Sequence, residues 1–273
     1  MTIFSGGTEG VLSPHVTFFL RSRDGAETGL SAIVGHTRDF APHEIGTEEQ
    51  ARQVASTVKS LVEQLGATQE QVQMVLIKCP LLTSDKLQII RDQSRVPVTT
   101  DTYESMAKSR YASAVGIAAA LSEIEESQVS EAVTKNNVWS GKASCSSGAE
   151  LENCHILVLA SAPSQNARLH AISRPMSDAI DAESIMTLLS TAKEAGGKVV
   201  QVFAKAEADP SGTVRTWRHT MNTDSDIHST RHARAAVGGL LAGIVADTQI
   251  YVSGGAEGQG PVGGGSLCVV YET

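Results

Sequence analysis

Three copies of one short motif constrain what this chain of 273 residues can fold into. The motif is a serine followed by small residues and a glutamate, and it occurs at residues 5–9, 146–150 and 253–257. Glycine next to the serine allows the backbone to approach a ligand closely. One Ser-Gly-Gly alone is usually a turn, but three related copies indicate repeated units whose serines meet at a common site.

The residues around the second and third copies follow one order, so the repeat is longer than the motif. In both units a helix is followed by an apolar strand that ends on a lysine, a helix that carries an arginine, the motif and a final strand. The markers are Lys78, Arg110 and Ser146 in the second unit and Lys205, Arg234 and Ser253 in the third. The arginine follows the lysine by 32 and 29 residues, and the serine follows the arginine by 36 and 19. The difference of 17 residues corresponds to the polar stretch 125–141, which we expect to be an inserted loop.

The pattern of apolar and capping residues predicts an α/β protein with internally repeated units. Helices are expected from Thr47 to Gly66, from about Ser84, at 103–124, from Asp181 to Gly196 and at 229–245. Strands are expected at 15–20, 30–34, 71–77, 96–99, 155–160, 171–172, 198–204, 249–252 and 266–271.

The repeat also predicts how the chain divides into units. A lysine and an arginine matching the first motif would lie ahead of Met1. Residues 1–26 are therefore interpreted as the C-terminal part of a first unit that is truncated at its N-terminus. Residues 27–162 and 163–273 then form the second and third units.

Composition argues against several classes of partner. The net charge of −8 and the pI near 5.5 argue against nucleic acid or an anionic membrane as the main partner. No apolar run approaches the ~20 residues needed to cross a bilayer. No signal peptide precedes the first motif, and the four cysteines lack metal-type spacing. We therefore expect a cytoplasmic protein with reduced, mostly buried thiols.

A lysine, a serine and an arginine in each unit point to acyl transfer. A serine hydroxyl becomes a good nucleophile when a neighbouring base takes its proton, and a lysine with a lowered pKa can be that base. Arginine offers a planar fork of donors that suits carbonyl oxygens, and glycine N–H groups can stabilise an oxyanion. The histidines show no spacing typical of a catalytic zinc site, so no cofactor is expected for catalysis.

Three stretches resemble the cyanuric acid hydrolase/barbiturase family of ring-opening amidohydrolases. They are residues 4–15 (Phe-Ser-Gly-Gly-Thr-Glu-Gly-Val-Leu-Ser-Pro-His), residues 218–221 (Arg-His-Thr-Met) and residues 253–265. The resemblance covers essentially the whole chain. It implies three α/β units around a pseudo-threefold axis, each lending one lysine, one arginine and one serine to a central site. Cyanuric acid is itself a threefold-symmetric ring, which fits such a site.

The resemblance also implies roles for individual residues. Lys78 would be the base and Ser146 the nucleophile that attacks a ring carbonyl. The substrate-binding positions would be Ser5, Gly6, Arg110, Ser147, Lys205, Arg234, Ser253 and Gly254, with Arg231 as a weaker candidate. A structural Mg²⁺ or Ca²⁺ would be held by Glu207 and by backbone oxygens of Ala256, Gln259, Gly260, Pro261 and Gly264, because hard cations prefer oxygen ligands. The family also implies a homo-oligomer, a tetramer.

Several alternatives stay open at the level of the sequence. Ser147 stands where the other motifs have glycine, so either Ser146 or Ser147 could be the nucleophile, and the alignment of the repeats favours Ser146. The small-molecule substrate could be cyanuric acid or barbituric acid, since both rings present the same carbonyl and N–H edges. A hydrolase for another cyclic imide is a further alternative. Because the first motif lacks its lysine and arginine, so is a non-catalytic binding protein with the same pocket.

Overall fold

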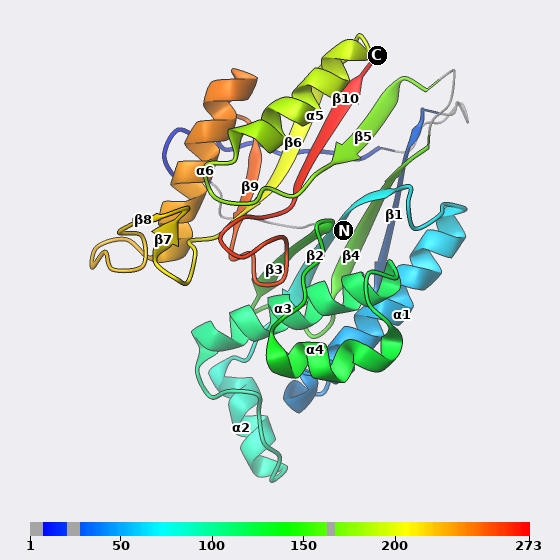
Figure 1. The fold of residues 1–273 in the computed structure, drawn as a ribbon. Helices are drawn as coiled ribbons and strands as arrows, with labels where there is room; N and C mark the ends of the chain where they lie inside the picture. The colour runs from blue at the N-terminus through cyan, green and yellow to red at the C-terminus, as the bar shows by residue number, and fades with distance from the viewer. Residues whose placement is uncertain (1–7, 21–27, 163–166) are drawn as a thin grey trace.

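The computed structural model describes residues 8–20, 28–162 and 167–273, which form two four-stranded sheets and their flanking helices (Figure 1). The helices are α1 (Glu48–Leu65), α2 (Ser84–Asp92), α3 (Thr102–Ala120), α4 (Val129–Lys135), α5 (Ala182–Glu194) and α6 (Ser229–Val245), with 3-10 turns at Pro42–Glu44 and Glu126–Gln128. The strands are β1 (Leu30–His36), β2 (Val72–Pro80), β3 (Ala143–Gly148), β4 (His155–Ser161), β5 (Leu169–Ser173), β6 (Lys198–Ala206), β7 (Thr213–Val214), β8 (Trp217–Arg218), β9 (Tyr251–Gly254) and β10 (Leu267–Glu272).

The two large sheets have the same topology. Sheet A has the strand order β1-β4-β2-β3, and sheet B has the order β5-β10-β6-β9. In each sheet the first three strands are antiparallel neighbours, and the last pair, β2–β3 or β6–β9, is parallel. The helices fall at equivalent places in the chain, α1 and α5 before the lysine-bearing strands and α3 and α6 after them. This confirms the α/β class and the internal repetition predicted from the sequence.

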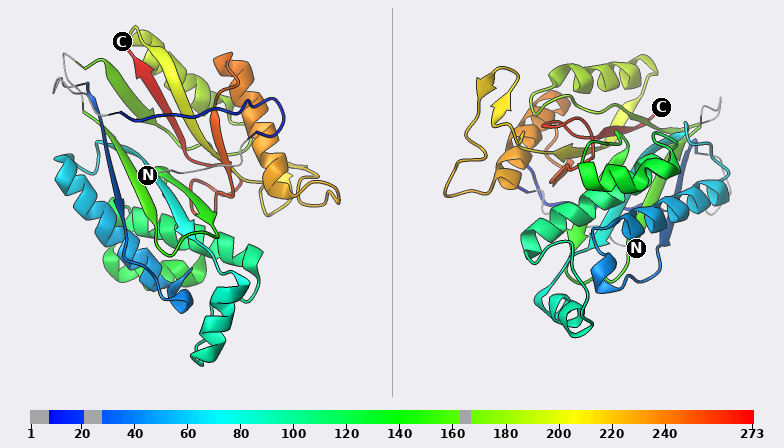
Figure 2. Two further views of the ribbon diagram at one scale, coloured as in Figure 1. Left: turned by 180° about the vertical axis from the view of Figure 1, so that it is seen from behind. Right: turned by 60° about the horizontal axis from the view of Figure 1, so that its bottom comes forward.

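The sheets pack with their inner faces together and carry their helices outside (Figures 1 and 2). Helices α1 and α3 cover the outer face of sheet A, and α5 and α6 cover that of sheet B. Between the sheets lies one cluster of buried side chains, contributed by Met74, Leu76, Leu157, Leu159, Ala171, Phe203, Cys268 and Val270. Since residues alternate between the faces of a strand, every second residue of β2 and β6 points into this inner layer.

Helix α1 forms where the sequence predicts it, because both ends are capped. The Thr47 hydroxyl accepts a hydrogen bond from the backbone N–H of Glu49, which satisfies one of the free donors of the first turn. Gly66 ends the helix with φ at 68°, a conformation that glycine adopts without a steric penalty. The apolar face formed by Val54, Val58 and its neighbours is buried against sheet A. The predicted helices at Ser84, Asp181 and 229–245 are likewise confirmed.

Two predicted strands are wrong. Residues 15–20 form no strand, although Thr17 accepts a hydrogen bond from the side chain of Gln201 and Phe19 stacks on Phe203. These residues pair with no strand edge in the described part of the chain, and an unpaired segment cannot form a ladder. Residues 96–99 are also irregular, since Pro97 has no backbone N–H to donate to a ladder.

The region 103–141 also differs from the prediction. Helix α3 stops at Ala120 rather than Ile124, because the backbone of Ser122 is left-handed with φ at 57°. The stretch predicted as an inserted loop contains the short helix α4. Val129 and Ala132 of α4 are buried against α3, and this apolar contact holds the insertion as a helix.

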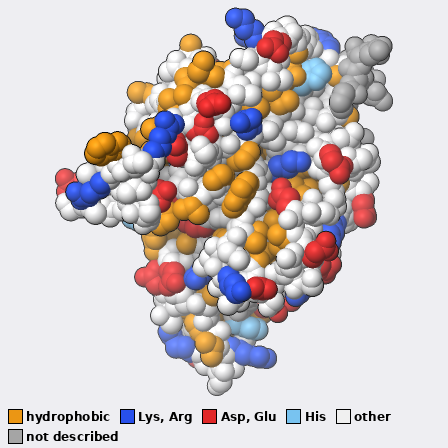
Figure 3. Space-filling view, viewed as in Figure 1, with side chains coloured by type: hydrophobic (Ala, Val, Ile, Leu, Met, Phe, Trp, Pro, Cys, Tyr) orange, Lys and Arg blue, Asp and Glu red, His pale blue; other side chains and the backbone are white. Residues whose placement is uncertain are grey.

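Figure 3 shows acidic and basic side chains interspersed over the face it displays, with no single basic patch. Among the described residues, no helix has the length and apolar character needed to span a bilayer. The thiols of Cys79, Cys145, Cys154 and Cys268 are buried and unpaired, as expected from their apolar surroundings. Burial raises the pKa of Cys145, the neighbour of Ser146, so this thiol is a poor nucleophile.

Candidate functional site

The parallel strand pair at one edge of each sheet sets a lysine beside a serine. In sheet A, Lys78 of β2 lies opposite Ser146 of β3. In sheet B, Lys205 of β6 lies opposite Ser253 of β9. The same register in both sheets makes the two lysines equivalent and the two serines equivalent, as the alignment of the repeats predicts.

Both lysines belong to the inner faces of their sheets. On β2 the alternation that places Met74 and Leu76 in the cluster between the sheets places Lys78 on the same face. On β6 the inward-facing Phe203 is followed two residues later by Lys205. The apolar strands thus lead each amine to the end of the inner layer.

The third unit holds its lysine and serine in direct contact. The Nζ atom of Lys205 donates to the Oγ of Ser253 at 2.9 Å and to the backbone oxygens of Cys145 at 2.8 Å and Gly254 at 3.1 Å. Burial, followed by repulsion from the Arg110 guanidinium, lowers the pKa of Lys205 to about 7. Lys205 therefore has a protonation equilibrium near neutrality and three oxygen atoms around it.

The second unit arranges the same two residue types differently. The Nζ atom of Lys78 forms an ion pair with Glu150, and this contact lowers the pKa of the Glu150 carboxyl. The Ser146 hydroxyl donates weakly to the backbone oxygen of Ile77 at 3.4 Å. Lys78 is thus directed at the glutamate of its own motif.

Accessibility also separates the two pairs. Lys205 and Ser253 are 0% and 2% exposed, so a ligand reaches neither without a rearrangement. Ser146 is only half-buried, and Lys78 retains 8% exposure. Of the two serines, only Ser146 presents surface at which a substrate carbonyl could be attacked.

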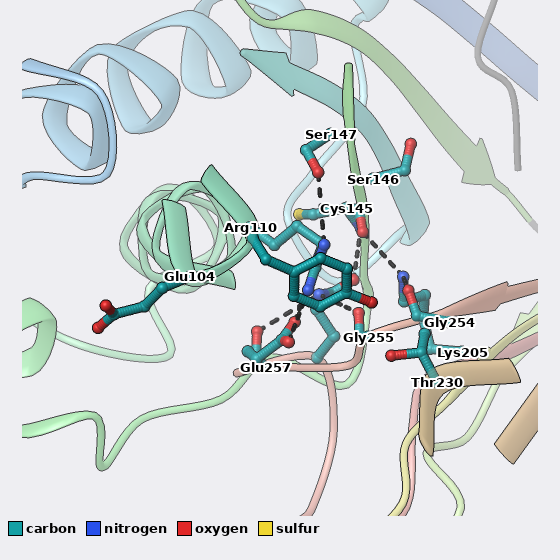
Figure 4. A network of polar contacts seen from close by, with 12 residues as sticks. Glu104, Arg110, Cys145, Ser146, Ser147, Lys205, Thr230, Gly254, Gly255 and Glu257 are labelled. Atoms are coloured by element: carbon teal, nitrogen blue, oxygen red, sulfur yellow. Dashed lines mark hydrogen bonds and ion pairs between the residues drawn. The ribbon is translucent and has the colours of Figure 1, made fainter. Parts of the chain in front are cut away.

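Arg110 of α3 joins the second and third motifs (Figure 4). Its Nε and Nη2 atoms donate to the two carboxylate oxygens of Glu257 at 2.8 and 2.7 Å, and Nη1 donates to the Ser147 hydroxyl at 3.3 Å. Burial would lower the pKa of Arg110 and raise that of Glu257. The attraction between the two groups outweighs burial, so the pKa of Arg110 is raised and that of Glu257 is lowered. Both groups are therefore ionised, and the guanidinium plane is fixed.

Arg234 of α6 repeats this arrangement with the glutamate of the first motif. Its Nε atom donates to Oε2 of Glu9 at 2.8 Å, and its Nη2 atom donates to Oε1. Arg231, the weaker candidate from the sequence, is mostly exposed and approaches the same carboxylate at 3.5 Å. Arg234 is therefore the structural equivalent of Arg110.

The second position of the motif differs between units for a steric reason. Ser147 of β3 pairs with Cys79, in the register in which Gly254 of β9 pairs with Ala206. At Gly254 a Cβ atom would come within 2.3 Å of Thr230 and 3.0 Å of the Nη1 atom of Arg234. The third unit therefore requires glycine there, whereas the second unit has room for a hydroxyl.

Ser5 and Gly6, the substrate-binding positions predicted for the first motif, lie outside the described residues. The remaining part of that motif, Thr8 and Glu9, brings its carboxylate to Arg234. The structure thus brings residues of all three motifs into one chain of contacts.

Of the residues predicted to hold a cation, Glu207 directly follows β6, and the others lie in the loop that leads from β9 to β10. The carboxylate of Glu207 accepts a hydrogen bond from the N–H of Gly263 at 3.3 Å. Burial, followed by repulsion from Glu257, raises the pKa of Glu207 to about 7. The backbone oxygens of Ala256, Gln259 and Pro261 accept hydrogen bonds within the loop from Gln259, Ser266 and Gly264 respectively.

This donor set suits a hard cation, although the structure contains no cluster of three His, Cys, Asp or Glu side chains that could hold a metal among its described residues. A backbone oxygen has two lone pairs, so each of these carbonyls retains one for a cation. Gly264 packs so closely that a Cβ atom would lie 2.0 Å from the Met176 oxygen. The loop thus packs closely and donates one backbone N–H to the partly buried carboxylate of Glu207.

Sequence reasoning did not assign any role to the glutamate that ends each motif. Glu9, Glu150 and Glu257 each form an ion pair with a cationic side chain of the site. Their recurrence at the fifth position of all three motifs was a signal that could have identified them.

Comparisons with known proteins find similar chains. Residues 1–272 match the family described as amidohydrolase ring-opening protein. A cyanuric acid amidohydrolase from Sarocladium sp is 76% identical over 273 residues, which cover all of this chain and 80% of that protein. A cyanuric acid amidohydrolase from Rhodococcus sp is 50% identical over 276 residues, covering all of this chain and 78% of that protein.

Two solved structures have the same fold. One is a cyanuric acid hydrolase described as an innovation by structural concatenation, with a TM-score of 0.87 and 43% identity over 98% of this chain and 77% of that one. The other is a cyanuric acid hydrolase from A. caulinodans, with a TM-score of 0.90 and 43% identity over 97% of this chain and 76% of that one. Concatenation of units is consistent with the equivalence of sheets A and B.

Proposed function

Because the chain belongs to the ring-opening amidohydrolase family and is a cyclic amide hydrolase, we propose that it opens the ring of cyanuric acid by hydrolysis. The proposed nucleophile is a serine that a lysine activates. The relatives named as cyanuric acid amidohydrolases, one of them 76% identical, support the substrate. The repeated lysine, serine and arginine support the site, since equivalent units suit a ring with three equivalent carbonyl groups.

Lys78 and Ser146 are the proposed reacting pair. In the reaction Lys78, released from Glu150 as the neutral amine, takes the Ser146 proton while Oγ attacks a ring carbonyl carbon. The C–N bond of the ring then breaks, the nitrogen takes the proton, and water hydrolyses the acyl-enzyme to carboxybiuret. The observation that carries this choice is accessibility, because Ser146 is half-buried whereas Ser253 is 2% exposed.

Arg110, Ser147 and the third-unit residues would bind the ring rather than react with it. Arg110 keeps its Nη1 donor at the Ser147 hydroxyl, where a charged donor can orient and polarise a carbonyl. Gly254 and Arg234 would serve the next carbonyl, together with Lys205 and Ser253 once a rearrangement exposes them, and Ser5 and Gly6 would serve the third. A bound Mg²⁺ or Ca²⁺, held by Glu207 and the loop carbonyls, would stabilise the loop and take no part in the reaction.

Replacing each serine in turn tests the nucleophile. Ser146→Ala should lower kcat for cyanuric acid by about 10³-fold or more, because loss of a nucleophile removes the covalent route. Ser147→Ala and Ser253→Ala are the matched controls, and they should raise KM while preserving most of kcat. The measurement is steady-state hydrolysis with each variant shown to be folded by circular dichroism.

A Ser146→Ala variant with wild-type kcat would refute the serine assignment. If Ser147→Ala or Ser253→Ala alone abolished turnover, that serine would be the nucleophile instead. The direct contact between Lys205 and Ser253 makes the third-unit pair the alternative to be excluded.

Barbituric acid is the alternative substrate, because it presents similar carbonyl and N–H edges. Turnover of the two rings by the same preparation, measured side by side, distinguishes a cyanuric acid hydrolase from a barbiturase. Assembly as a homo-oligomer, including a tetramer, stays a prediction that sedimentation analysis tests.

A further inference from the structure

The glutamate of the third motif forms a bidentate ion pair with the arginine of the second unit, using both carboxylate oxygens. Glu257 accepts from Nε and Nη2 of Arg110 at 2.8 and 2.7 Å. The Arg110 side chain is only 7% exposed, so this pair lies in a setting where charge-assisted hydrogen bonds are strong. The contact joins residues 147 positions apart in the sequence. It connects helix α3, which packs on sheet A, to the loop that follows β9 of sheet B.

The glutamate of the first motif forms the same bidentate ion pair with Nε and Nη2 of the arginine of the third unit. Nε of Arg234 donates to Oε2 of Glu9, and Nη2 donates to Oε1. Both side chains are largely buried, at 14% and 13% exposure. Two independent pairs with one geometry follow one rule, in which the arginine of a unit binds the glutamate of the next motif in cyclic order.

Each pair occupies one edge of the guanidinium and leaves the other edge for the site. Nη1 of Arg110 points to Ser147, and Nη1 of Arg234 lies beside Gly254, the equivalent position. A bidentate pair fixes the guanidinium plane as well as its position. The remaining donors are therefore held beside the second residue of the motif, where the substrate carbonyls are proposed to bind.

We infer that Glu257 and Glu9 are positioning residues, which orient Arg110 and Arg234 toward the substrate; this inference rests on the proposed function. They touch no reacting atom themselves. Glu150 of the second motif contacts Lys78, so it lies where it can influence the proposed base.

Glu257→Gln tests the inference with little change of shape. Glutamine accepts one N–H but turns its own NH₂ group toward the second donor, so Arg110 must rotate. KM for cyanuric acid should rise about 10- to 100-fold, the range expected for loss of a charged hydrogen bond, with a smaller change in kcat. Glu9→Gln should act in the same way through Arg234.

A double-mutant cycle separates positioning from general stabilisation. If Glu257 acts through Arg110, then Glu257→Gln should change KM by less than about twofold in an Arg110→Met background. Glu272→Gln is the matched control, because it removes a glutamate from an exposed pair with Arg168 at the other end of sheet B. This control should keep wild-type KM and kcat.

Wild-type KM in a folded Glu257→Gln variant would overturn the inference, as would an equal rise of KM in both backgrounds. If Glu257→Gln does not fold, Glu9→Gln and the Arg234→Met background decide in the same way. Absence of turnover in the wild-type chain would refute the proposed function instead. In that case the dissociation constant of cyanuric acid, measured by calorimetry for the wild type and each variant, replaces KM in the double-mutant cycle.

Discussion

The second and third units share a backbone plan but treat their lysines in opposite ways. Lys78 and Lys205 lie at equivalent positions, each opposite a serine on a parallel strand. Lys205 is fully buried and hydrogen-bonded to its serine, whereas Lys78 reaches a largely exposed glutamate. The strand register therefore fixes the positions of the two amines, and it does not determine which side chains they contact.

The loops that follow the two serines also differ. In the third unit the long glycine-rich loop from Gly255 to Ser266 folds back over sheet A, where the Ser266 hydroxyl donates to the oxygen of Ala143. Gly265 of this loop packs against the backbone of Lys205. In the second unit a short turn leads from Gly148 to β4 and leaves Ser146 half-exposed. The unit with the shorter loop keeps the accessible serine.

Replacing each lysine by methionine should give the largest difference in kcat between the two units. Lys78→Met removes the proposed base, so kcat for cyanuric acid should fall by about 10³-fold or more. Lys205→Met keeps the Lys78–Ser146 pair, so we expect a higher KM and a kcat within about tenfold of wild type. Steady-state kinetics on both variants measure the contrast.

The opposite pattern, with the larger loss of kcat in Lys205→Met, would assign the chemistry to the buried third-unit pair. A matched control is Lys193→Met, which removes an exposed lysine from α5 and should change neither constant.

Much of the fold was predictable because the repeated elements carry local signals. The capped helix after Thr47 and the helix at 229–245 were confirmed, and so were the two apolar strands that end near the lysines. The strand predicted at 15–20 was wrong, because strand formation depends on a partner that an apolar pattern cannot supply. Helix α4 was missed, since a polar stretch with few apolar residues gives a weak periodic signal.

The site was predictable in its residue types and not in its pairings. The repeat order made Lys78 and Lys205 equivalent, and the strand register sets each of them opposite a serine, which the sequence did not predict. The bond from Arg110 to Glu257 crosses between units, and spacing within a single unit contains no information about such a contact. For the same reason, sequence could not show that Lys205 contacts its serine whereas Lys78 contacts a glutamate.

The pH dependence of the free energy of unfolding tests whether Lys205 is desolvated in the folded chain. Its pKa is about 7 in the folded chain, against an ordinary value of 10.5. Between these values the unfolded chain binds a proton that the folded chain does not, so raising the pH stabilises the folded state. The free energy of unfolding of wild type, relative to Lys205→Met, should increase from pH 7 upward by at most about 1.4 kcal/mol per pH unit.

Urea unfolding of both proteins between pH 6.5 and 9.5 measures this difference. Lys193→Met supplies the baseline, since its side chain is exposed. A difference between wild type and Lys205→Met that stays constant over this range would show that Lys205 is not desolvated as the structure indicates.

The smallest expected effect concerns the loop that distinguishes the third unit, where Glu207 follows Lys205 by two residues and Pro80 stands at the equivalent place after Lys78. Mg²⁺ or Ca²⁺ at about 100 times its Kd should stabilise the wild-type chain by about 2.7 kcal/mol, a rise in Tm of roughly 5 °C. Because the pKa of Glu207 is about 7, protons compete with the cation below neutrality, and the rise should be larger at pH 8 than at pH 6. Glu207→Gln should lose most of the rise at both pH values in calorimetric scans. An equal rise in wild type and Glu207→Gln would place the cation elsewhere.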